Sequence, residues 1–379
     1  MRSKKNLKNQ NPKFKTFNLI EVSEKRLKNN LEFFQKITDA EIIPVLKSNA
    51  YGCGIREIAK ILEKLKVKII AVNSYVEARQ IYQIFSRKIL VLGVVDRENV
   101  GLLKGKRISY VIQSSEDLRT FGKLRRKINV HMELNTGMNR LGLKSDEVSE
   151  YLKTLTSFRN LHLEGIMTHL ASADDSQNSS VESQVCEFDE IVEKVLATGF
   201  SPKYFHIANT AGVDRTKSKF ANAARVGIGI YGINPIKDND ERFQRLENLQ
   251  PILELKSTIT KVINLEAGEK VGYGGSFIAP NKMKIGVLPL GYYEGIPRIL
   301  SNCGIVMADE MKLPIVGRIC MNHMMIDISK TSLQEGDKIT VISQNPKMQN
   351  SIRGMSCKSE ILEYEILAKL NENVRRKII

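Results

Sequence analysis

The sequence predicts an α/β fold, with an N-terminal (β/α)8 TIM-like barrel plus a C-terminal mostly-β domain. Three observations support this prediction. The chain has 379 residues, too many for one small core. Short apolar runs alternate with amphipathic stretches from about residue 42 to residue 231. After about Asp238 the pattern changes to strand-like segments separated by Gly, Pro or Asp turns.

Eight apolar runs are the candidate strands of the barrel. They are Ile42–Lys47, Ile69–Val72, Ile89–Leu92, Tyr110–Ile112, Val130–Leu134, Leu163–His169, Tyr204–Ile207 and Ala224–Ile228. Helical patterns lie between them, at Ile55–Leu65, Ser74–Phe85, Asp146–Thr156 and Val181–Thr198. Eight strands separated by helix-length segments predict a parallel sheet that closes on itself.

The remaining elements define the predicted domains. Strand-like segments follow at Leu253–Val262, Lys284–Leu290, Met311–Val316, Met324–Ile328 and Lys338–Ile342, and a helix-like segment from Ser359 to Val374 closes the chain. We expect a basic flexible N-terminus (1–12), the barrel (13–240) and the β domain (241–379). Phe14–Val22 is also extended in pattern and is a candidate strand of the β domain.

Composition favours an ordinary globular protein, 42% hydrophobic and 26% charged. The net charge of +16 is spread along the whole chain without an RNA-binding signature, so nucleic-acid binding is an alternative that rests on charge alone. The five cysteines are widely spaced, and neither a disulfide framework nor a metal site is predicted. With no secretory signal and no membrane-length apolar run, we expect a cytoplasmic protein without a membrane partner.

Lys47 is the most informative residue of the chain. The apolar run Ile42–Leu46 ends at this lysine and then breaks into a Gly/Asn-rich turn. An ammonium group at the point where a buried strand opens into a loop is partly desolvated, which lowers its pKa. Lys47 is therefore a candidate Schiff-base lysine. The alternative is a lysine at the rim that extends into solvent.

Polar residues also follow other candidate strands, at the barrel end that carries function in such folds. They are Tyr51 after the first strand, Asn135 through Arg140 after the fifth, His169 after the sixth, Asn209 and Thr210 after the seventh, and Arg225, Gly227 and Gly229 in and after the eighth. The hydroxyl of Thr210 and the Gly-spaced N–H groups after the last strand suit a phosphate. Together with Lys47, they suggest pyridoxal phosphate as cofactor.

Eight motifs carry a resemblance to a known family. They are VLKSNAYGCG at 45–54, LNTGMNRLG at 134–142, MTHLASAD at 167–174, HIANTAG at 206–212, RVGIGIYG at 225–232, VGYGGSF at 271–277, LPLGYYEG at 288–295 and VGRICMN at 316–322. In these motifs the chain resembles the bacterial alanine racemases, fold-type III pyridoxal-phosphate enzymes. The similarity spans nearly the whole chain after the first ten or so residues.

The resemblance implies a role for each matching residue. Lys47 would hold the cofactor and act as one catalytic base, and Tyr273 would be the second base, reaching into the active site of the other subunit. Arg140 and Met321 would meet the substrate carboxylate. The cofactor would be bound by Lys47, Tyr51, His169, Asn209, Thr210, Arg225, Gly227, Ile228 and Tyr364, and the entrance would be lined by Asp174, Tyr292, Arg298 and Arg318.

The implied activity is the interconversion of L-alanine and D-alanine by a homodimer, which would supply D-alanine for peptidoglycan synthesis. Lys47 would act on the face of the D enantiomer and Tyr273 on that of the L enantiomer. Three alternatives remain open. One is a broad-specificity or serine racemase on the same scaffold. Another is a non-catalytic pyridoxal-phosphate carrier, which should lack the β domain and the second base. The third is a decarboxylase, which should place a carboxylate at the pyridine nitrogen where Arg225 is implied.

The chain also departs from the family pattern. Many members carry a lysine, modified to a carbamate, at the position of Glu133, and its negative charge orients the arginine that matches Arg140. We expect Glu133 to supply that charge directly; the alternative is an ordinary carboxylate paired with another base. Asn322 stands where an aspartate is usual, and Phe277 and Glu294 lie in the second-base and entrance motifs.

Overall fold

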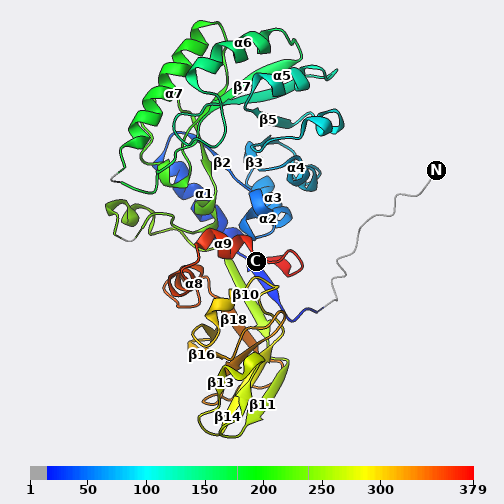
Figure 1. The fold of residues 1–379 in the computed structure, drawn as a ribbon, viewed down its shortest axis with the longest axis vertical. Coiled ribbons are helices and arrows are strands. Elements are labelled where there is room, and N and C mark those ends of the chain that lie inside the picture. The colour runs from blue at the N-terminus through cyan, green and yellow to red at the C-terminus, as the bar shows by residue number, and fades with distance from the viewer. Residues whose placement is uncertain (1–14, 177, 238) are drawn as a thin grey trace, which may run out of the picture.

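The computed structural model describes residues 15–176, 178–237 and 239–379. The predicted basic extension at 1–12 lies outside these ranges. The molecule is elongated, with a barrel at one end and a β domain at the other (Figure 1). The short helices α8 and α9 and the C-terminus lie between the two parts. Within the described ranges, none of the helices combines the length and apolar character that crossing a bilayer requires.

Eight parallel strands form the barrel, as predicted. They are β2 (Glu41–Pro44), β3 (Ile69–Val72), β4 (Lys88–Val91), β5 (Ile108–Ile112), β6 (Ile128–Glu133), β7 (Leu161–Met167), β8 (Tyr204–His206) and β9 (Ala223–Val226), in the spatial order β2-β9-β8-β7-β6-β5-β4-β3. Past the end of β2, Val45 forms a parallel bridge with Ala71, and the N–H of Leu46 donates to the Ala71 carbonyl at 2.7 Å. These contacts nearly close the barrel.

Helices connect the barrel strands and cover them. They are α1 (Glu24–Ile37), α3 (Ile55–Lys64), α4 (Tyr75–Ile81), α5 (Ser115–Gly122), α6 (Val148–Thr156) and α7 (Ser180–Ala197). In α3 the buried residues Ile55, Ile58, Ala59 and Leu62 recur at helical spacing, so one face packs on the barrel. Ser74 caps α4 in a capping box with Glu77, which fixes where this helix begins.

The barrel interior is filled from alternate strand positions, because successive side chains of a strand point to opposite faces. Ile43 and Val45, Ile69 and Ala71, Leu90, Val111, Met167, Tyr204 and Ala223 form one apolar cluster there. Branched apolar side chains are the usual filling of such barrels.

The second domain is built on a nine-stranded sheet. Its strands are β1 (Leu19–Val22), β10 (Leu253–Thr258), β11 (Lys261–Leu265), β14 (Met283–Leu288), β15 (Ile305–Ala308), β16 (Met311–Val316), β17 (Met324–Asp327), β18 (Lys338–Ile342) and β19 (Arg375–Ile378). β1 pairs with β10 antiparallel and with β19 parallel, so the extended segment before the barrel does lie in this sheet. A small hairpin, β12 (Lys270–Val271) with β13 (Phe277–Ile278), carries Tyr273 at its turn.

Two expectations for this part were wrong. The segment Leu253–Val262 is divided between β10 and β11 rather than forming one strand. The single helix expected from Ser359 to Val374 is instead the end of α8 (Ile352–Ser359), then α9 (Glu363–Ala368), and then a strand. Glu360 takes a left-handed conformation with φ 57°, which stops α8 and turns the chain toward the barrel.

Candidate active site

Lys47 begins a turn of left-handed backbone, α2 (Lys47–Tyr51), just past the carboxyl end of β2. Ser48, Asn49, Ala50 and Tyr51 have φ between 52° and 55°. Such a conformation costs about 1–2 kcal/mol for each residue with a Cβ, so contacts must hold it. Glu77 Oε1 accepts from the N–H of Ser48 at 2.7 Å, and Asn49 Oδ1 accepts from the N–H of Ile55 at 2.8 Å. The turn therefore holds Lys47 and Tyr51 in fixed positions.

A cavity of about 530 Å³ opens at this end of the barrel. Twelve of the predicted residues line it: Lys47, Tyr51, Glu133, Arg140, His169, Asp174, Asn209, Thr210, Arg225, Gly227, Ile228 and Tyr364. They come from both ends of the barrel segment and from α9, yet the fold brings them to one place. Tyr364 arrives because α9 packs on α2, with its ring centroid 6.2 Å from that of Tyr51.

Arg225 projects from β9 into the closed end of this cavity and is only 4% exposed. Its Nη2 donates to the carbonyl of Thr168 at 2.7 Å and to His169 Nδ1 at 3.1 Å. Its Nη1 donates to the carbonyl and to Nδ1 of His206, at 2.7 and 2.8 Å. The guanidinium is thereby locked, with His169 held beside it.

Thr210 and the backbone after β9 form another part of the cavity lining. Thr210 Oγ1 accepts from the N–H of Gly229 at 3.3 Å. A Cβ built on Gly227 would lie 2.3 Å from the hydroxyl oxygen of Tyr51, so only glycine leaves room for that phenol. Backbone N–H groups, a threonine hydroxyl and a tyrosine hydroxyl together form a cradle suited to a phosphate.

The charges of the cavity act on one another. Burial, followed by the positive charges of Arg140 and Arg225, lowers the pKa of Lys47 below its usual value. Burial, with Arg225 second, lowers the pKa of His169 to about 3, so this imidazole is neutral. A lysine with a lowered pKa in a cleft is a candidate nucleophile or base.

Glu133 ends β6 at the wall of the same cavity and is 4% exposed. It accepts a hydrogen bond from Gln113 Nε2 at 3.0 Å. Burial raises the pKa of this carboxyl, while Gln113, Arg225 and Arg140 act in the opposite direction. The Glu133 carboxyl therefore interacts electrostatically with both arginines of the site.

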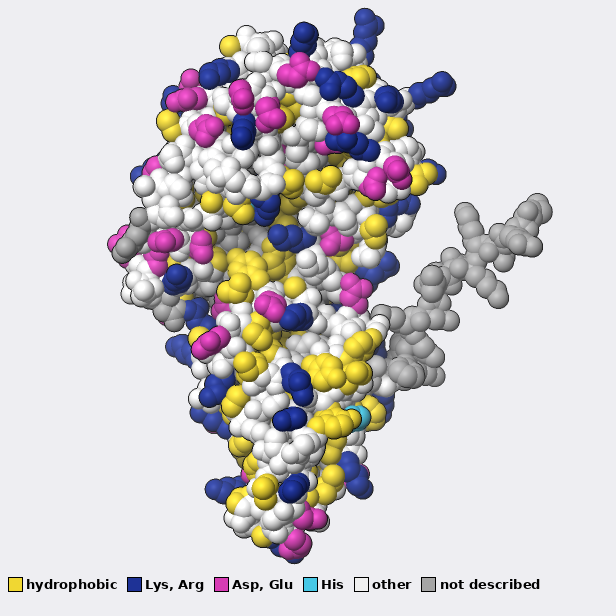
Figure 2. Space-filling view, viewed as in Figure 1, with side chains coloured by type: hydrophobic (Ala, Val, Ile, Leu, Met, Phe, Trp, Pro, Cys, Tyr) yellow, Lys and Arg dark blue, Asp and Glu magenta, His cyan; other side chains and the backbone are white. Residues whose placement is uncertain are grey.

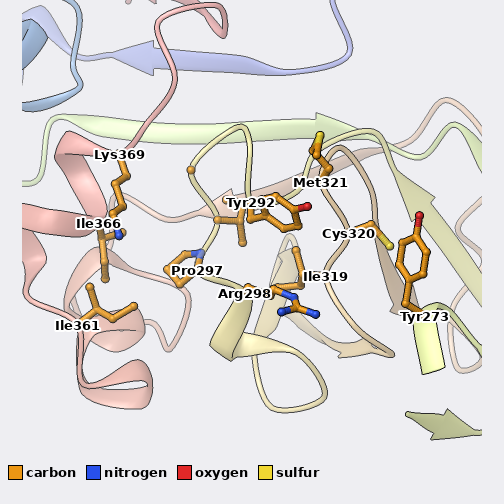
Figure 3. Close-up of a pocket in the computed structure, with 12 residues that line it drawn as sticks. Tyr273, Tyr292, Pro297, Arg298, Ile319, Cys320, Met321, Ile361, Ile366 and Lys369 are labelled. Atoms are coloured by element: carbon orange, nitrogen blue, oxygen red, sulfur yellow. The ribbon is translucent and has the colours of Figure 1, made fainter. Parts of the chain in front are cut away.

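Five other predicted residues lie elsewhere. Tyr273, Tyr292, Arg298 and Met321 line a second cavity, of about 580 Å³, in the β domain. Figure 3 shows Tyr273 and Cys320 on one side of it and Ile361, Ile366 and Lys369, from the segment around α9, on the other. Of the described residues, none lines both cavities. Arg318 lies beside this second group, with Nη1 3.2 Å from a Cβ built on Gly274.

The departures at Asn322 and Glu294 prove to be partners. Asn322 Nδ2 donates to Glu294 Oε1 at 2.8 Å, and Glu294 Oε2 accepts from the N–H of Gly291 at 2.7 Å. A carboxylate at both positions would place two negative charges together, so the amide at 322 matches the acid at 294. Phe277 is partly buried in β13 and packs with the small cluster around Val271.

The sequence did not reveal the residues that hydrogen-bond to Arg225 and Glu133. His206 bonds Arg225 and Gln113 bonds Glu133. One signal was available: His131 and Glu133 are two residues apart on a predicted strand and so point to the same face. His206 also begins the motif HIANTAG.

Comparisons with known proteins agree over nearly the full chain. Residues 22–235 match the family model described as alanine racemase, N-terminal domain, and residues 252–378 match alanine racemase, C-terminal domain. An alanine racemase of Francisella philomiragia is 32% identical over 370 residues, which cover 96% of this chain and 100% of that protein. The solved alanine racemase of Clostridium difficile 630 has a TM-score of 0.89 at 27% identity, covering 97% of both chains. A solved alanine racemase of Bartonella henselae with covalently bound pyridoxal phosphate has a TM-score of 0.82 at 24% identity, covering 96% of this chain and 100% of that one.

Proposed function

This chain belongs to the alanine racemase family, and on that premise we propose that it interconverts L-alanine and D-alanine with pyridoxal phosphate as cofactor. The observation that carries the proposal is the barrel cavity, which is lined by Lys47, by Arg225 with His169, and by the cradle of Thr210, Gly227 and Tyr51. The D-alanine would supply peptidoglycan synthesis in the cytoplasm.

The donor set of the cavity fits pyridoxal phosphate. Thr210, Tyr51 and the backbone from Gly227 offer hydrogen bonds to a phosphate, and the close approach of Tyr51 to Gly227 is a cradle that a Cβ would fill. Lys47 supplies the amine for covalent attachment. Arg225 can only donate and does not give up its proton, so it suits a ring nitrogen that accepts. The relative from Bartonella henselae holds this cofactor covalently, which supports the same assignment here.

Once bound, the cofactor supplies a conjugated ring that stabilises negative charge at the substrate Cα. The chain then has to bind the amino acid and move protons. Arg140 at the cavity rim binds the carboxylate, and Glu133 orients Arg140. Lys47 Nζ, with its lowered pKa, takes or gives the Cα proton on the face of the D enantiomer. Arg225 holds His169 by a hydrogen bond of 3.1 Å, and both side chains line the same cavity.

The second proton must come from the other face, where Tyr273 is the proposed base. In one chain Tyr273 lines the other cavity and is 72% exposed, and Met321 is 54% exposed. Ile278 and Ile299 are exposed as well, at 55% and 60%. In Figure 2 hydrophobic side chains gather across the middle of the molecule and over the upper part of the β domain. We infer a homodimer in which the partner's β domain brings Tyr273 and Met321 to the barrel cavity.

The activity is tested by chiral chromatography of L-alanine incubated with the purified protein and pyridoxal phosphate. We expect D-alanine to form, and Lys47→Ala to abolish its formation. Absence of D-alanine from a protein that still binds the cofactor would contradict alanine racemisation, and a substrate panel that includes serine would then identify the substrate or leave a carrier.

The shared site is tested by mixing two inactive variants, Lys47→Ala and Tyr273→Phe. Random exchange makes half of the dimers mixed, and each mixed dimer keeps one intact site of two, so about a quarter of the wild-type activity should return. Lys47→Ala mixed with Lys47→Arg is the matched control and should stay inactive. No recovery in the first mixture would contradict a site made by two subunits.

A further inference from the structure

A line of polar side chains crosses the inside of the barrel beneath the candidate active site. Strand positions that share a face with the apolar interior carry polar groups: Lys88 on β4, Ser109 on β5, Asn129 and His131 on β6, His206 on β8 and Arg225 on β9. His131 and His206 are 0% exposed, and Glu164 on β7 is 5% exposed. Because polar groups are costly at such a place, this line has to be fully hydrogen-bonded.

The hydrogen bonds along the line have only one possible direction. Arg225 has no acceptor, so its Nη1 donates to His206 Nδ1 at 2.8 Å. His206 must therefore carry its proton on Nε2, which lies 2.8 Å from His131 Nδ1 and donates to it. His131 in turn carries its proton on Nε2 and donates to Glu164 Oε2 at 3.4 Å. Each bond points away from Arg225 and toward Glu164.

Glu164 is built to receive this line. Its Oε2 also accepts from Ser109 Oγ at 2.7 Å, and its Oε1 accepts from Asn129 Nδ2 at 3.3 Å and from the Lys88 ammonium group. Four donors converge on two oxygens, so an ionised carboxylate satisfies them all and an amide does not. The ammonium of Lys88 keeps the charge of Glu164 compensated.

The strands are also shaped around the His131 ring. A Cβ built on Gly165 would lie 2.4 Å from His131 Nδ1, so glycine makes room for the ring on β7. The pairing of β6 with β7 shifts register between Val130 and His131. Both features occur where the line crosses from one strand to the next.

We propose that Glu164 is a positioning residue for Arg225: acting through His131 and His206, it fixes both imidazoles as neutral Nε2–H tautomers and thereby holds the guanidinium in place. Within the described ranges, the hydrogen-bond acceptors that Arg225 contacts directly are all neutral carbonyl or imidazole groups. Glu164 lets a distant negative charge act on it along polarised bonds. The expected effect on cofactor binding rests on the proposed function, whereas the assignment of protons to the nitrogens of His131 and His206 does not.

Glu164→Gln tests the proposal because glutamine has one acceptor where glutamate has two. The Lys88 ammonium can only donate, so the amide oxygen should turn to Lys88 and the amide NH2 should face His131. His131 would then have to change tautomer, His206 would follow, and an N–H would meet the N–H of Arg225. Lys88→Met in the Glu164→Gln background removes the competing ammonium donor. The amide oxygen of Gln should then turn back toward His131 and restore the wild-type tautomers.

The readout is the ¹⁵N chemical shift of each histidine ring nitrogen in labelled protein before cofactor is added. In the wild type, His131 and His206 should both show a bare Nδ1 and a protonated Nε2. His162→Gln and His323→Gln identify the exposed histidines, and Ser109→Ala is the matched control that removes one bond to Glu164 without changing its charge. In Glu164→Gln the protonated nitrogen should change on both rings, and the dissociation constant of pyridoxal phosphate should rise roughly tenfold or more.

A protonated Nδ1 on His131 or His206 in the wild type would overturn the proposal, even if the variant does not fold. So would Glu164→Gln with both tautomers and the cofactor affinity unchanged. The tautomers are read without cofactor or substrate, so this test does not depend on the proposed activity. If Glu164→Gln changes the tautomers but the protein does not racemise alanine, the order of protons along the line is supported and only the proposed activity is contradicted.

Discussion

The hydroxyl oxygen of Tyr51 lies 2.3 Å from the point where a Cβ on Gly227 would stand. The φ of Gly227 is negative, −96°, so no left-handed backbone calls for glycine here, whereas the close approach of Tyr51 does. The two residues come from opposite ends of the barrel segment, one from the turn after β2 and the other from the end of β9. Their contact forms the part of the cavity that we propose binds the phosphate.

Gly227→Ala should therefore weaken cofactor binding without unfolding the protein. The new methyl group must displace the Tyr51 ring, and overpacking of this kind costs about 1–3 kcal/mol, or roughly 5- to 150-fold in affinity. Absorbance titration with pyridoxal phosphate measures it. Gly101→Ala is the matched control, because a Cβ there meets nothing within 4 Å. Equal affinities of the two variants would contradict the space argument.

The lowered pKa of Lys47 should appear in the pH dependence of cofactor attachment. Only the neutral amine attacks an aldehyde, and a lower pKa leaves more neutral amine at a given pH, so attachment should speed up below the pH expected for a free lysine. Arg140→Gln removes a charge that lowers this pKa, and the midpoint should move up. Stopped-flow absorbance at a series of pH values measures the midpoint.

The opposite variant sharpens this test. Glu77 acts to raise the pKa of Lys47, so Glu77→Gln, which removes that charge, should move the midpoint down. A pKa change of one unit alters the amount of neutral amine about tenfold when the pH lies below the pKa. Shifts of the same sign in the two variants would show that geometry rather than charge governs attachment.

Glu133→Gln should keep the cofactor and lose Cα proton transfer. The variant retains the hydrogen-bonding shape beside Gln113 but removes the charge that faces Arg140 and Arg225. Exchange of the alanine Cα proton with deuterated water, followed by NMR, should slow by roughly tenfold or more, the range for an interaction with a charged group. Wild-type activity should also be unchanged when bicarbonate is removed, since no carbamate is needed. Full exchange in Glu133→Gln would refute the role.

The barrel could be predicted because most of its strands are short apolar runs that alternate with helix-length segments. The end of the chain could not. The sequence around Glu360 has no glycine or proline to mark the break between α8 and α9, and the N–H of this left-handed residue donates to the Ser356 carbonyl at 2.8 Å. The strand β19 has the sequence Arg-Arg-Lys-Ile, which has no strand pattern of its own and pairs with β1 because that edge is available.

The candidate site was predicted better than its support. Lys47 and Arg225 sit at strand ends, where periodicity and motif agree. His131 and Glu164 lie in strand interiors and His206 ends β8, and a polar residue in an apolar run indicates only that a partner exists. Which partner it is depends on strand order and register, as in the shift between β6 and β7. Whether a second chain completes the site stays a prediction.

Three neutral histidines, of which His131 and His206 are fully buried and His169 is partly buried, should make the fold sensitive to acid. Burial, with Lys88 and Arg225 next, lowers the pKa of His131 to about 3, and His169 and His206 are shifted in the same direction. Between about pH 6.5 and pH 3 the unfolded chain binds protons on these rings that the folded chain does not, so stability falls as pH falls, by up to about 1.4 kcal/mol per pH unit for each histidine.

Denaturant unfolding from pH 7 to pH 5 measures this slope. His131→Gln, which can still bridge His206 and Glu164, should reduce the slope by about one proton. His162→Gln, at an exposed position, should leave the slope as it is, and an equal effect of the two variants would contradict the assignment.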